Sequence, residues 1–251
     1  PMYNRYLGAY APGSSIKPLI GAIGLMYNCF TADEDFGISG TRWQKDKSWG
    51  DLFVTTLEKY SGPANLENAL VYSDNIYFAK AALKIGKSNL ITGLENLGFD
   101  NKIDFEQDIT KSTYGSLDSD ASIANSGYGQ SEMLVNPIHM ASIYSIFANN
   151  GNMIKPYIEF SKGETKTYKE NAINSDIANE IKEDLSQVVK SGTATDCNID
   201  GKNIYGKTGT AEIKQSQSDE NGTEIGWFDA FDDDGFLIVS MVQNVKDIGG
   251  S

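Results

Sequence analysis

The apolar side chains of this chain change their spacing about two thirds of the way along its 251 residues. Up to about residue 190 they recur every three or four positions, as in helices that bury one face. From Ile204 onward they gather instead in short stretches rich in β-branched and aromatic residues, at 204–213, 225–231 and 236–245. The turn residues 232–235 join the last two stretches, which predicts an antiparallel hairpin. Helices in the middle of the chain and strands at its end predict an α+β fold.

Start and stop signals place the expected helices. A helix that begins at Ser14 or Ser15 keeps Pro18 in its first turn, where backbone N–H groups have no partner within the helix. Gly86 is expected to end a helix that follows Asp74. Further helices are expected from the Asn65 cap to Tyr72, from Asn136-Pro137 to Gly151, and over about 174–190. Loops with short helices are expected over 31–62, and a polar loop over 214–222.

Charge and residue usage exclude several classes of function. The chain has 34 acidic and 21 basic residues and a net charge of −13, so it should repel phosphate backbones and anionic lipid surfaces. We therefore expect no nucleic-acid partner. The single histidine, His139, rules out a multi-histidine metal centre and is expected to be a surface or hydrogen-bonded residue without a catalytic role. Cys29 and Cys197 lack the spacing of zinc ligands and are expected to be buried free thiols, so no metal site is expected.

The first candidate for chemistry is Ser14-Ser15-Ile16-Lys17. Ser14 and Lys17 are three residues apart, so they share one face of a helix. At the helix start, free N–H groups and the helix dipole favour negative charge on the serine oxygen. A serine needs a base within hydrogen-bond reach, and Lys17 can be that base if burial or nearby cations hold it neutral. A Ser-x-x-Lys spacing on its own also arises by chance in a chain of this length.

Two more polar groups stand at structural boundaries. Ser73-Asp74-Asn75 lies between two predicted helices, where it can be a plain helix cap or can supply a proton-relaying hydroxyl and a substrate-orienting amide. Lys207-Thr208-Gly209-Thr210 lies within a predicted strand, where glycine lets a ligand or another backbone approach closely. The lysine and the two hydroxyls would suit a carboxylate; the alternative is an exposed edge strand guarded by Lys207.

The three groups occur together in an order that resembles class B penicillin-binding proteins, because Ser-x-x-Lys, Ser-Asp-Asn and Lys-Thr-Gly are the signature of that superfamily. The resemblance extends to four further segments. They are Tyr10–Pro18, Gly127–Gln130 with Asn136-Pro137, Gly206–Glu212 with Gly226–Phe228, and Trp43–Gly50, the last being similar to the low-affinity, β-lactam-resistant branch.

This resemblance implies an α+β transpeptidase fold, with an antiparallel sheet flanked by helices, a mostly helical lobe and the active site at their junction. It implies that Ser14 is acylated by a D-Ala-D-Ala carbonyl or by a β-lactam, with Lys17 as base, Ser73 as proton relay and Asn75 binding the substrate amide. Lys207 would supply positive potential, and the Thr208-Gly209-Thr210 segment would hold the substrate carboxylate. The backbone N–H groups of Ser14 and Thr210 would form the oxyanion hole, and no cofactor is required.

The implied enzyme is a serine D,D-transpeptidase that cross-links peptidoglycan stem peptides, with β-lactams as further ligands. Residues 1–251 would be its transpeptidase domain, apparently without the family's upstream strands and C-terminal helix. It would act at the extracytoplasmic face of the cell membrane of a Gram-positive bacterium, and would be held there only through an anchor outside this chain.

Three alternatives remain to be weighed. A β-lactam sensor would be acylated without transferring the acyl group, and its missing region would carry several membrane segments where a synthase has one anchor. A class A β-lactamase would need a Glu-x-x-Leu-Asn stretch, which is absent from the sequence. The segment 201–208 matches a phosphate-binding loop, but it does not follow an apolar strand and Gly209 makes a poor helix start.

Overall fold

The computed structural model of the chain describes residues 4–38, 40–130, 132–158, 165–213 and 222–246. Its largest sheet has three antiparallel strands in the order β5-β6-β7, which are Ile204–Ile213, Thr223–Asp232 and Leu237–Gln243. The predicted hairpin is therefore confirmed as β6-β7, and β5 pairs with β6 as the third strand of the sheet. Its α-helices are α1 (Lys17–Met26), α2 (Leu66–Val71), α3 (Asn75–Asn96), α4 (Asp120–Ser126), α5 (Pro137–Ala148) and α6 (Ser175–Ser191).

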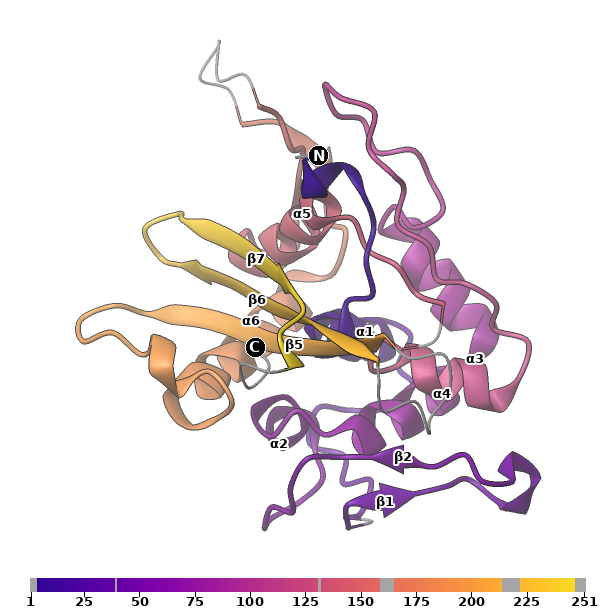
Figure 1. Cartoon of the computed structure of the whole chain (residues 1–251). Coiled ribbons are helices and arrows are strands. Elements are labelled where there is room, and N and C mark those ends of the chain that lie inside the picture. Colours follow the sequence, from indigo (N-terminus) through magenta and orange to yellow (C-terminus); the bar gives the residue numbers. More distant parts are fainter. Residues whose placement is uncertain (1–3, 39, 131, 159–164, 214–221, 247–251) are drawn as a thin grey trace.

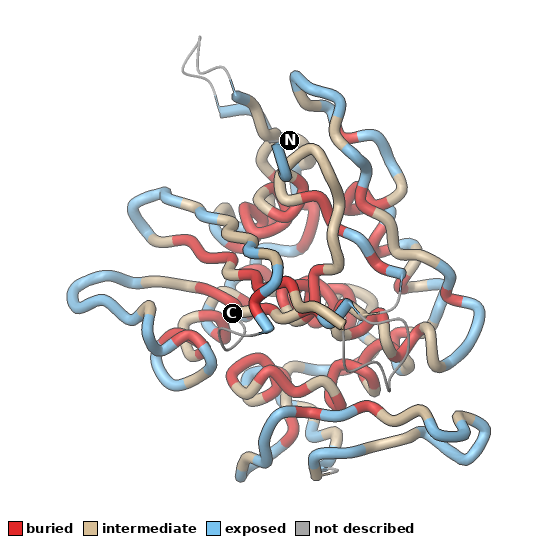
Figure 2. The backbone as a smooth tube through the Cα atoms, viewed as in Figure 1, coloured by how far each residue is buried: buried red, intermediate tan, exposed pale blue. Residues whose placement is uncertain are grey.

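Helix α1 lies at the centre of the molecule. The sheet, with α5 and α6 beside it, lies on one side of α1, and α2, α3 and α4 lie on the other (Figure 1). Ile16, Leu19, Ile20 and Ile23 of this central segment are buried within the main hydrophobic core. Burying a side chain of this size stabilises the fold by about 1.5–3 kcal/mol. Figure 2 shows buried backbone gathered around α1 and exposed backbone along the outer hairpins. The α+β prediction is confirmed.

The predicted helix starts at Asn65 and Asn136 are confirmed, because each depends on a capping residue next to the helix in the sequence. Asn65 accepts a hydrogen bond from the Asn68 N–H, and Asn136 accepts one from the Ile138 N–H, with Pro137 at the first helical position. Such caps satisfy N–H groups that have no partner inside the helix. The helix expected over 174–190 is α6.

One prediction about helices needs correction. The expected helix at Ser14 begins instead as a 3-10 turn, Gly13–Ile16, which leads into α1 with Pro18 in the first turn. Gly86 ends a helix as predicted: its backbone is non-helical, at φ 77° and ψ 158°, so it separates two helical segments of α3, of which the second runs to Asn96. The second half resumes because Leu90 and its neighbours bury an apolar face in the core.

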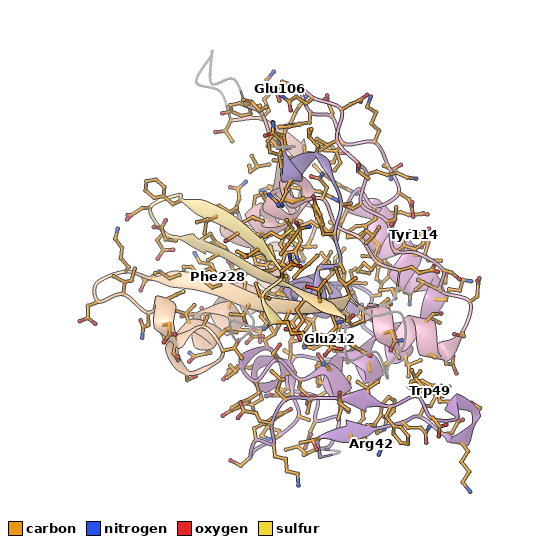
Figure 3. All side chains as sticks on the ribbon, in the orientation of Figure 1. Arg42, Trp49, Glu106, Tyr114, Glu212 and Phe228 are labelled. Carbon is orange, nitrogen blue, oxygen red and sulfur yellow. The ribbon has the colours of Figure 1, made fainter. Side chains whose placement is uncertain are left out.

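The segment expected to hold only loops and short helices contains a small hairpin that the sequence did not predict. Strands β1 (Arg42–Trp43) and β2 (Val54–Thr55) pair antiparallel, around the 3-10 turn Lys47–Trp49. Two-residue strands are too short to show an alternating pattern. Side chains hold the hairpin: the Arg42 guanidinium lies 3.6 Å from the centre of the Phe53 ring, and Trp43 meets Trp49 edge-on (Figure 3).

The remaining elements are short. They are the strands β3 (Met153–Ile154) and β4 (Thr167–Lys169), and the 3-10 turns Arg5–Leu7 and Thr195–Cys197. The loop predicted over 214–222 lies outside the described residues apart from Gly222. Within the described ranges, no helix combines the length and the apolar character that a membrane span requires.

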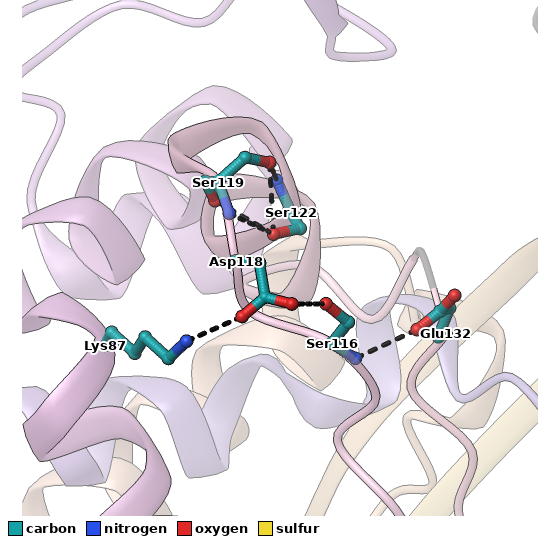
Figure 4. Close-up of polar contacts among 6 residues, drawn as sticks. All are labelled: Lys87, Ser116, Asp118, Ser119, Ser122 and Glu132. Atoms are coloured by element: carbon teal, nitrogen blue, oxygen red, sulfur yellow. Dashed lines mark hydrogen bonds and ion pairs between the residues drawn. The ribbon is translucent and has the colours of Figure 1, made fainter.

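Polar contacts hold α4 against α3 (Figure 4). Ser119 and Ser122 form a reciprocal capping box at the start of α4, in which each side chain accepts from the other's backbone N–H. Just before it, Asp118 accepts hydrogen bonds from the Ser116 hydroxyl at 2.7 Å and from Lys87 Nζ of α3 at 2.8 Å. These contacts fix the chain that leads into the segment 127–130 beside the candidate site.

Candidate active site

The turn that carries Ser14 is packed tightly between two other backbones. A Cβ atom at Gly13, whose φ is +52°, would lie 2.4 Å from the Thr210 carbonyl oxygen, and one at Gly209 would lie 2.5 Å from Ser15 Oγ. The Gly13 N–H also donates to the Gly129 carbonyl at 3.1 Å. Glycine is therefore required on both sides of this contact. Strand β5, which carries Lys207, thus lies directly against the turn that carries Ser14.

Ser14 stays accessible within this packed turn. Its side chain is half-buried, whereas Gly13, Ser15 and Lys17 around it are buried. The helix α1 that follows directs its N-terminal end, with its partial positive charge, toward this residue. A hydroxyl in this position can reach a substrate and can carry developing negative charge.

Lys17 is fully buried and strongly hydrogen-bonded. Its Nζ donates to the Ser73 carbonyl oxygen and to Asn75 Oδ1, both at 2.7 Å, and lies 3.2 Å from Ser73 Oγ. Burial lowers the pKa of Lys17 well below its ordinary value, and the charge of Lys207 lowers it further, while Asp74 opposes both effects. A neutral amine still has two N–H groups for the two short bonds. The condition that the base hypothesis requires, an amine held toward its neutral form, is thus present.

Ser73 lies between the two lysines. Its hydroxyl is 3.2 Å from Lys17 Nζ and accepts a hydrogen bond from Lys207 Nζ at 3.0 Å. Its backbone has a positive φ of 53°, which is uncommon for a residue other than glycine. Such strain persists only where the surroundings hold it, and it is typical of functional sites.

Asp74 stabilises the start of α3, next to Ser73. Its carboxylate caps α3 by accepting from the Ile76 and Tyr77 N–H groups, and it also accepts from the Tyr60 hydroxyl at 2.9 Å. Asp74 is therefore the helix cap that one reading predicted, and the side chains of Ser73 and Asn75 lie beside Lys17, while their functional roles stay predictions.

Asn75 joins Lys17 to the small hairpin. Its Oδ1 accepts from Lys17, and its Nδ2 donates to the Thr55 carbonyl of β2 at 2.9 Å. Its side chain is thus oriented beside the base, while its predicted contact with a substrate amide stays a prediction. Thr55 was not anticipated, because only the paired hairpin brings it here.

Lys207 is buried, so the alternative of an exposed lysine guarding an edge strand is wrong. Strand β5 does lie at the edge of the sheet, but Lys207 points inward, where Nζ donates to Ser73 Oγ and to the Thr208 carbonyl at 3.1 Å. Burial lowers the pKa of Lys207 to about 7, and the carboxyl of Asp229 acts in the opposite direction.

Thr208 and Thr210 flank buried Gly209 and are themselves partly exposed. The Thr208 hydroxyl lies 2.6 Å from that of Thr193, in the loop after α6, so two hydroxyls from distant segments meet beside Lys207. Thr193 was missed, since nothing in its local sequence marks it. The Thr210 backbone lies next to the turn that carries Ser14, as the predicted oxyanion pair requires, although the pair itself stays a prediction. Glu212 lies at the end of the same strand (Figure 3).

Asp229 on β6 was also missed, although the sequence carried a signal for it. Ile225, Trp227, Asp229 and Phe231 alternate along the inward face of the strand, and Asp229 is the charged member of that row. A carboxylate at a core position of an alternating pattern departs from the expected apolar residue.

The other singled-out residues lie outside this constellation. His139 is buried, with Nδ1 2.7 Å from Ser112 Oγ and Nε2 2.8 Å from the Leu97 carbonyl oxygen, so it is a hydrogen-bonded core residue. Cys29 and Cys197 are free thiols, but they are partly exposed and not buried as expected, because they lie at the core margin and in a surface turn. The segment 201–208 runs into β5 and opens no helix, which contradicts a phosphate-binding loop. Among the described residues, no cluster of three or more His, Cys, Asp or Glu could hold a metal ion.

Comparison with known proteins supplies the family context. The model of the penicillin binding protein transpeptidase domain matches residues 1–251. Penicillin-binding protein 3 of Bacillus subtilis is 40% identical over 258 residues, which cover 100% of this chain and 39% of that protein. Penicillin-binding protein 1A/1B of the same organism is 29% identical, over 86% of this chain and 23% of its own length. The chain thus spans well under half the length of these curated relatives.

Solved structures show the same fold. The imipenem acyl-enzyme complex of penicillin-binding protein A from M. tuberculosis superposes with a TM-score of 0.82 at 20% identity, over 97% of this chain and 58% of that one. The transpeptidase domain of Burkholderia pseudomallei penicillin-binding protein 3 reaches a TM-score of 0.84 at 18% identity, over 98% of this chain and 76% of that one.

Proposed function

Because the chain belongs to the penicillin-binding protein transpeptidase family, we propose that it is a serine-type D,D-transpeptidase of class B that cross-links peptidoglycan stem peptides through an acyl-enzyme on Ser14. The observation that carries the proposal is the convergence of Lys17 and Lys207 on the Ser73 hydroxyl, beside the turn that bears Ser14. The stretch Trp43–Gly50 supports placing it in the low-affinity, β-lactam-resistant branch.

In the first step, Ser14 Oγ attacks the carbonyl carbon of the D-Ala-D-Ala bond. Lys17, held toward its neutral form by burial and by Lys207, accepts the hydroxyl proton. Negative charge on the former carbonyl oxygen is stabilised by the backbone N–H groups of Ser14 and Thr210, and losing one such donor typically costs about 3–4 kcal/mol in barrier. Ser73 relays a proton from Lys17 to the leaving amine, D-alanine departs, and an ester to Ser14 remains.

In the second step, an amine from another stem peptide attacks that ester. Its proton passes back through the same groups to Ser14 Oγ, the ester bond breaks, and the new amide is the cross-link. No electrons are gained or lost and each proton has a named carrier, so the reaction requires no cofactor. A β-lactam would enter by the first step, since opening its ring leaves the amine tethered to the acyl group.

Substrate orientation would come from the exposed edge of β5. Lys207 supplies positive potential to a substrate carboxylate, and the hydroxyls of Thr208 and Thr210 donate to it, while Gly209 allows the backbone to approach. Asn75 would bind the peptide amide beside the base. We further propose that residues 1–251 act as the transpeptidase domain on the extracytoplasmic face of a bacterial membrane, where these substrates lie, in a Gram-positive organism.

The decisive test is the intact mass of the full chain after incubation with benzylpenicillin. We expect a single drug adduct on the wild-type chain and none on Ser14→Ala, because that variant lacks the attacking oxygen. Ser142→Ala is the matched control, since its hydroxyl is buried in α5 away from the site, and it should keep the adduct. A wild-type chain that stays unmodified at high drug concentration and long incubation would contradict the proposal.

A second measurement separates a transpeptidase from a β-lactam sensor. The full chain is given an acyl donor that ends in D-Ala-D-Ala together with a free amine acceptor, and the products are followed by mass. A transpeptidase forms the new amide and releases D-alanine. A chain that is acylated by penicillin but yields no transfer product with any amine would instead be a sensor.

A further inference from the structure

A buried carboxyl group lies directly across the sheet from Lys207. In the register of β5 and β6, Lys207 pairs with Asp229, so their side chains emerge on the same face. Both residues have 0% of their surface exposed. Neither oxygen of Asp229 has a hydrogen-bond partner among the described residues. Figure 1 shows the two strands side by side next to α1.

Three elements face this carboxyl group. Lys207 faces it from β5, Ser15 from the turn before α1, and Tyr144 from α5. The Ser15 hydroxyl lowers the pKa of Asp229, but neither group forms a hydrogen bond of ordinary distance and angle among the described residues. Tyr144 donates to the Ser15 carbonyl oxygen at 2.8 Å, so its hydroxyl is engaged elsewhere. Lys207 is thus the cationic group that faces Asp229.

Stability does not account for this residue. A buried carboxyl group without hydrogen bonds opposes folding, and an apolar side chain of similar volume would pack better. The neighbouring inward positions on β6, Trp227 and Phe231, follow that rule. A departure from it next to an active lysine is the pattern expected where function, and not stability, sets the residue.

We propose that Asp229 is a positioning residue for the acyl-transfer reaction: its carboxyl group, opposite Lys207 on the neighbouring strand, acts on Lys207 through its charge and so sets how much positive charge Lys207 presents to the substrate carboxylate and to Lys17. This inference rests on the proposed function. It adds a charged group, opposite Lys207, to the hydrogen-bonded series of Lys207, Ser73 and Lys17.

The electrostatics agree with this geometry. Burial raises the pKa of Asp229 to about 8 and lowers that of Lys207 to about 7, and each group shifts the other back toward its ordinary value. The charge of Lys207 in turn lowers the pKa of Lys17. Without the carboxyl group, only burial would act on the pKa of Lys207, so that pKa would fall further and Lys207 would lose its proton at a lower pH. Lys17 would then lose the cation that helps to keep it neutral.

The test compares Asp229→Asn with Asp184→Asn in the full chain. Asp184, on α6, is a matched control because it is also buried, has an unpartnered oxygen and has a pKa raised to about 8 by burial. The rate constant of acylation is measured with benzylpenicillin and with its methyl ester, from about pH 6 to about pH 9. The ester lacks the carboxylate that Lys207 would bind.

We expect Asp229→Asn to be acylated by benzylpenicillin about fivefold more slowly at neutral pH, because a drop of about one unit in the pKa of Lys207, which is about 7, takes its protonated fraction from about one half to about one tenth. Acylation by the methyl ester should slow less, so the ratio of the rate constant for benzylpenicillin to that for its ester should fall. Activity that requires protonated Lys207 is lost as pH rises through its pKa, so the alkaline limb should move to lower pH. Asp184→Asn should behave as the wild type does.

The outcomes separate the two proposals. If the wild type is acylated and Asp229→Asn matches it in rate, acid preference and pH profile, the role of Asp229 is refuted while the proposed function stands. If Asp184→Asn loses as much as Asp229→Asn, the effect is one of folding and the role is likewise refuted. Absence of acylation in the wild type would refute the proposed function itself. Should Asp229→Asn fail to fold, Asp229→Ser, which also removes the charge, takes its place under the same criteria.

Discussion

At the scale of single residues, the site depends on two amines that approach one hydroxyl. Lys17 and Lys207 both lie within 3.2 Å of Ser73 Oγ, and both are fully buried. Two ammonium groups this close in a poorly solvated environment repel each other strongly, so one of them must give up its proton. The contacts favour Lys17 as the neutral member, because Lys207 has Asp229 opposite and Lys17 has neutral acceptors at 2.7 Å.

Replacement of Lys17 should therefore remove the base without removing the nucleophile. We expect Lys17→Ala to lower the acylation rate constant by about 10²–10⁴-fold, the usual contribution of a general base. Time-resolved intact mass with benzylpenicillin measures it. Lys102→Ala is the control, since Lys102 forms an exposed ion pair with Asp108, and it should be acylated normally. Normal acylation of Lys17→Ala would mean that another group takes the proton.

At the scale of elements, the site depends on how closely β5 approaches the turn Gly13–Ile16. The approach places Lys207 within reach of Ser73 and the Thr210 backbone beside Ser14. It is possible because Gly209 and Gly13 present no side chain at the contact. A displacement of about 1 Å at a reacting group can cost about 10²-fold in rate, so this packing controls the chemistry.

Gly209→Val tests that packing. A Cβ atom there would lie 2.5 Å from Ser15 Oγ and 2.8 Å from the Ser15 nitrogen, so β5 must move away from the turn. We expect the free energy of unfolding to fall by about 1–3 kcal/mol and acylation to slow by at least about 10²-fold. Chemical denaturation and the penicillin reaction measure the two effects.

The control for this variant is Gly201→Asn, just before β5. That glycine has a positive φ of 78°, which asparagine tolerates, and open space surrounds the position of its Cβ atom. Both properties should stay near wild type. A Gly209→Val chain that reacts as fast as the wild type would show that the close approach is not needed.

At the scale of the whole molecule, the pH dependence of stability should reflect a group far from the site. Burial lowers the pKa of His139 to about 4, below its usual value near 6.5, while the hydrogen bond to the Leu97 carbonyl oxygen acts in the opposite direction. The folded state therefore favours neutral His139. Its contribution is complete above the pKa of the unfolded chain and is lost as pH falls from about 6.5 toward about 4.

We expect the free energy of unfolding to drop by about 2 kcal/mol from this residue alone between about pH 7 and about pH 5. Urea unfolding at the two pH values measures it. In His139→Gln, whose amide can keep both hydrogen bonds without titrating, that part of the drop should disappear. An equal drop in wild type and variant would assign the acid sensitivity to other groups.

Local sequence determined those features that depend on neighbours along the chain. The sequence predicted the helix caps at Asn65, Asp74 and Asn136 and the short strands near the end, because each involves residues that are close together along the chain. The order of the three polar motifs could also be recognised from the sequence. These features predicted the α+β fold. They also brought Ser14, Lys17, Ser73 and Lys207 forward as candidates, and the structure places Lys17, Ser73 and Lys207 in direct contact beside Ser14.

Only the tertiary structure decided the state of those groups. The hairpin that brings Thr55 to Asn75, the loop that brings Thr193 to Thr208, and the register that sets Asp229 opposite Lys207 all join residues distant in sequence. The charge of a lysine depends on how deeply distant segments bury it and on which ionisable groups they place nearby. The sequence identifies Lys17 as the candidate base, but its burial by the rest of the fold determines whether its amine can act as one.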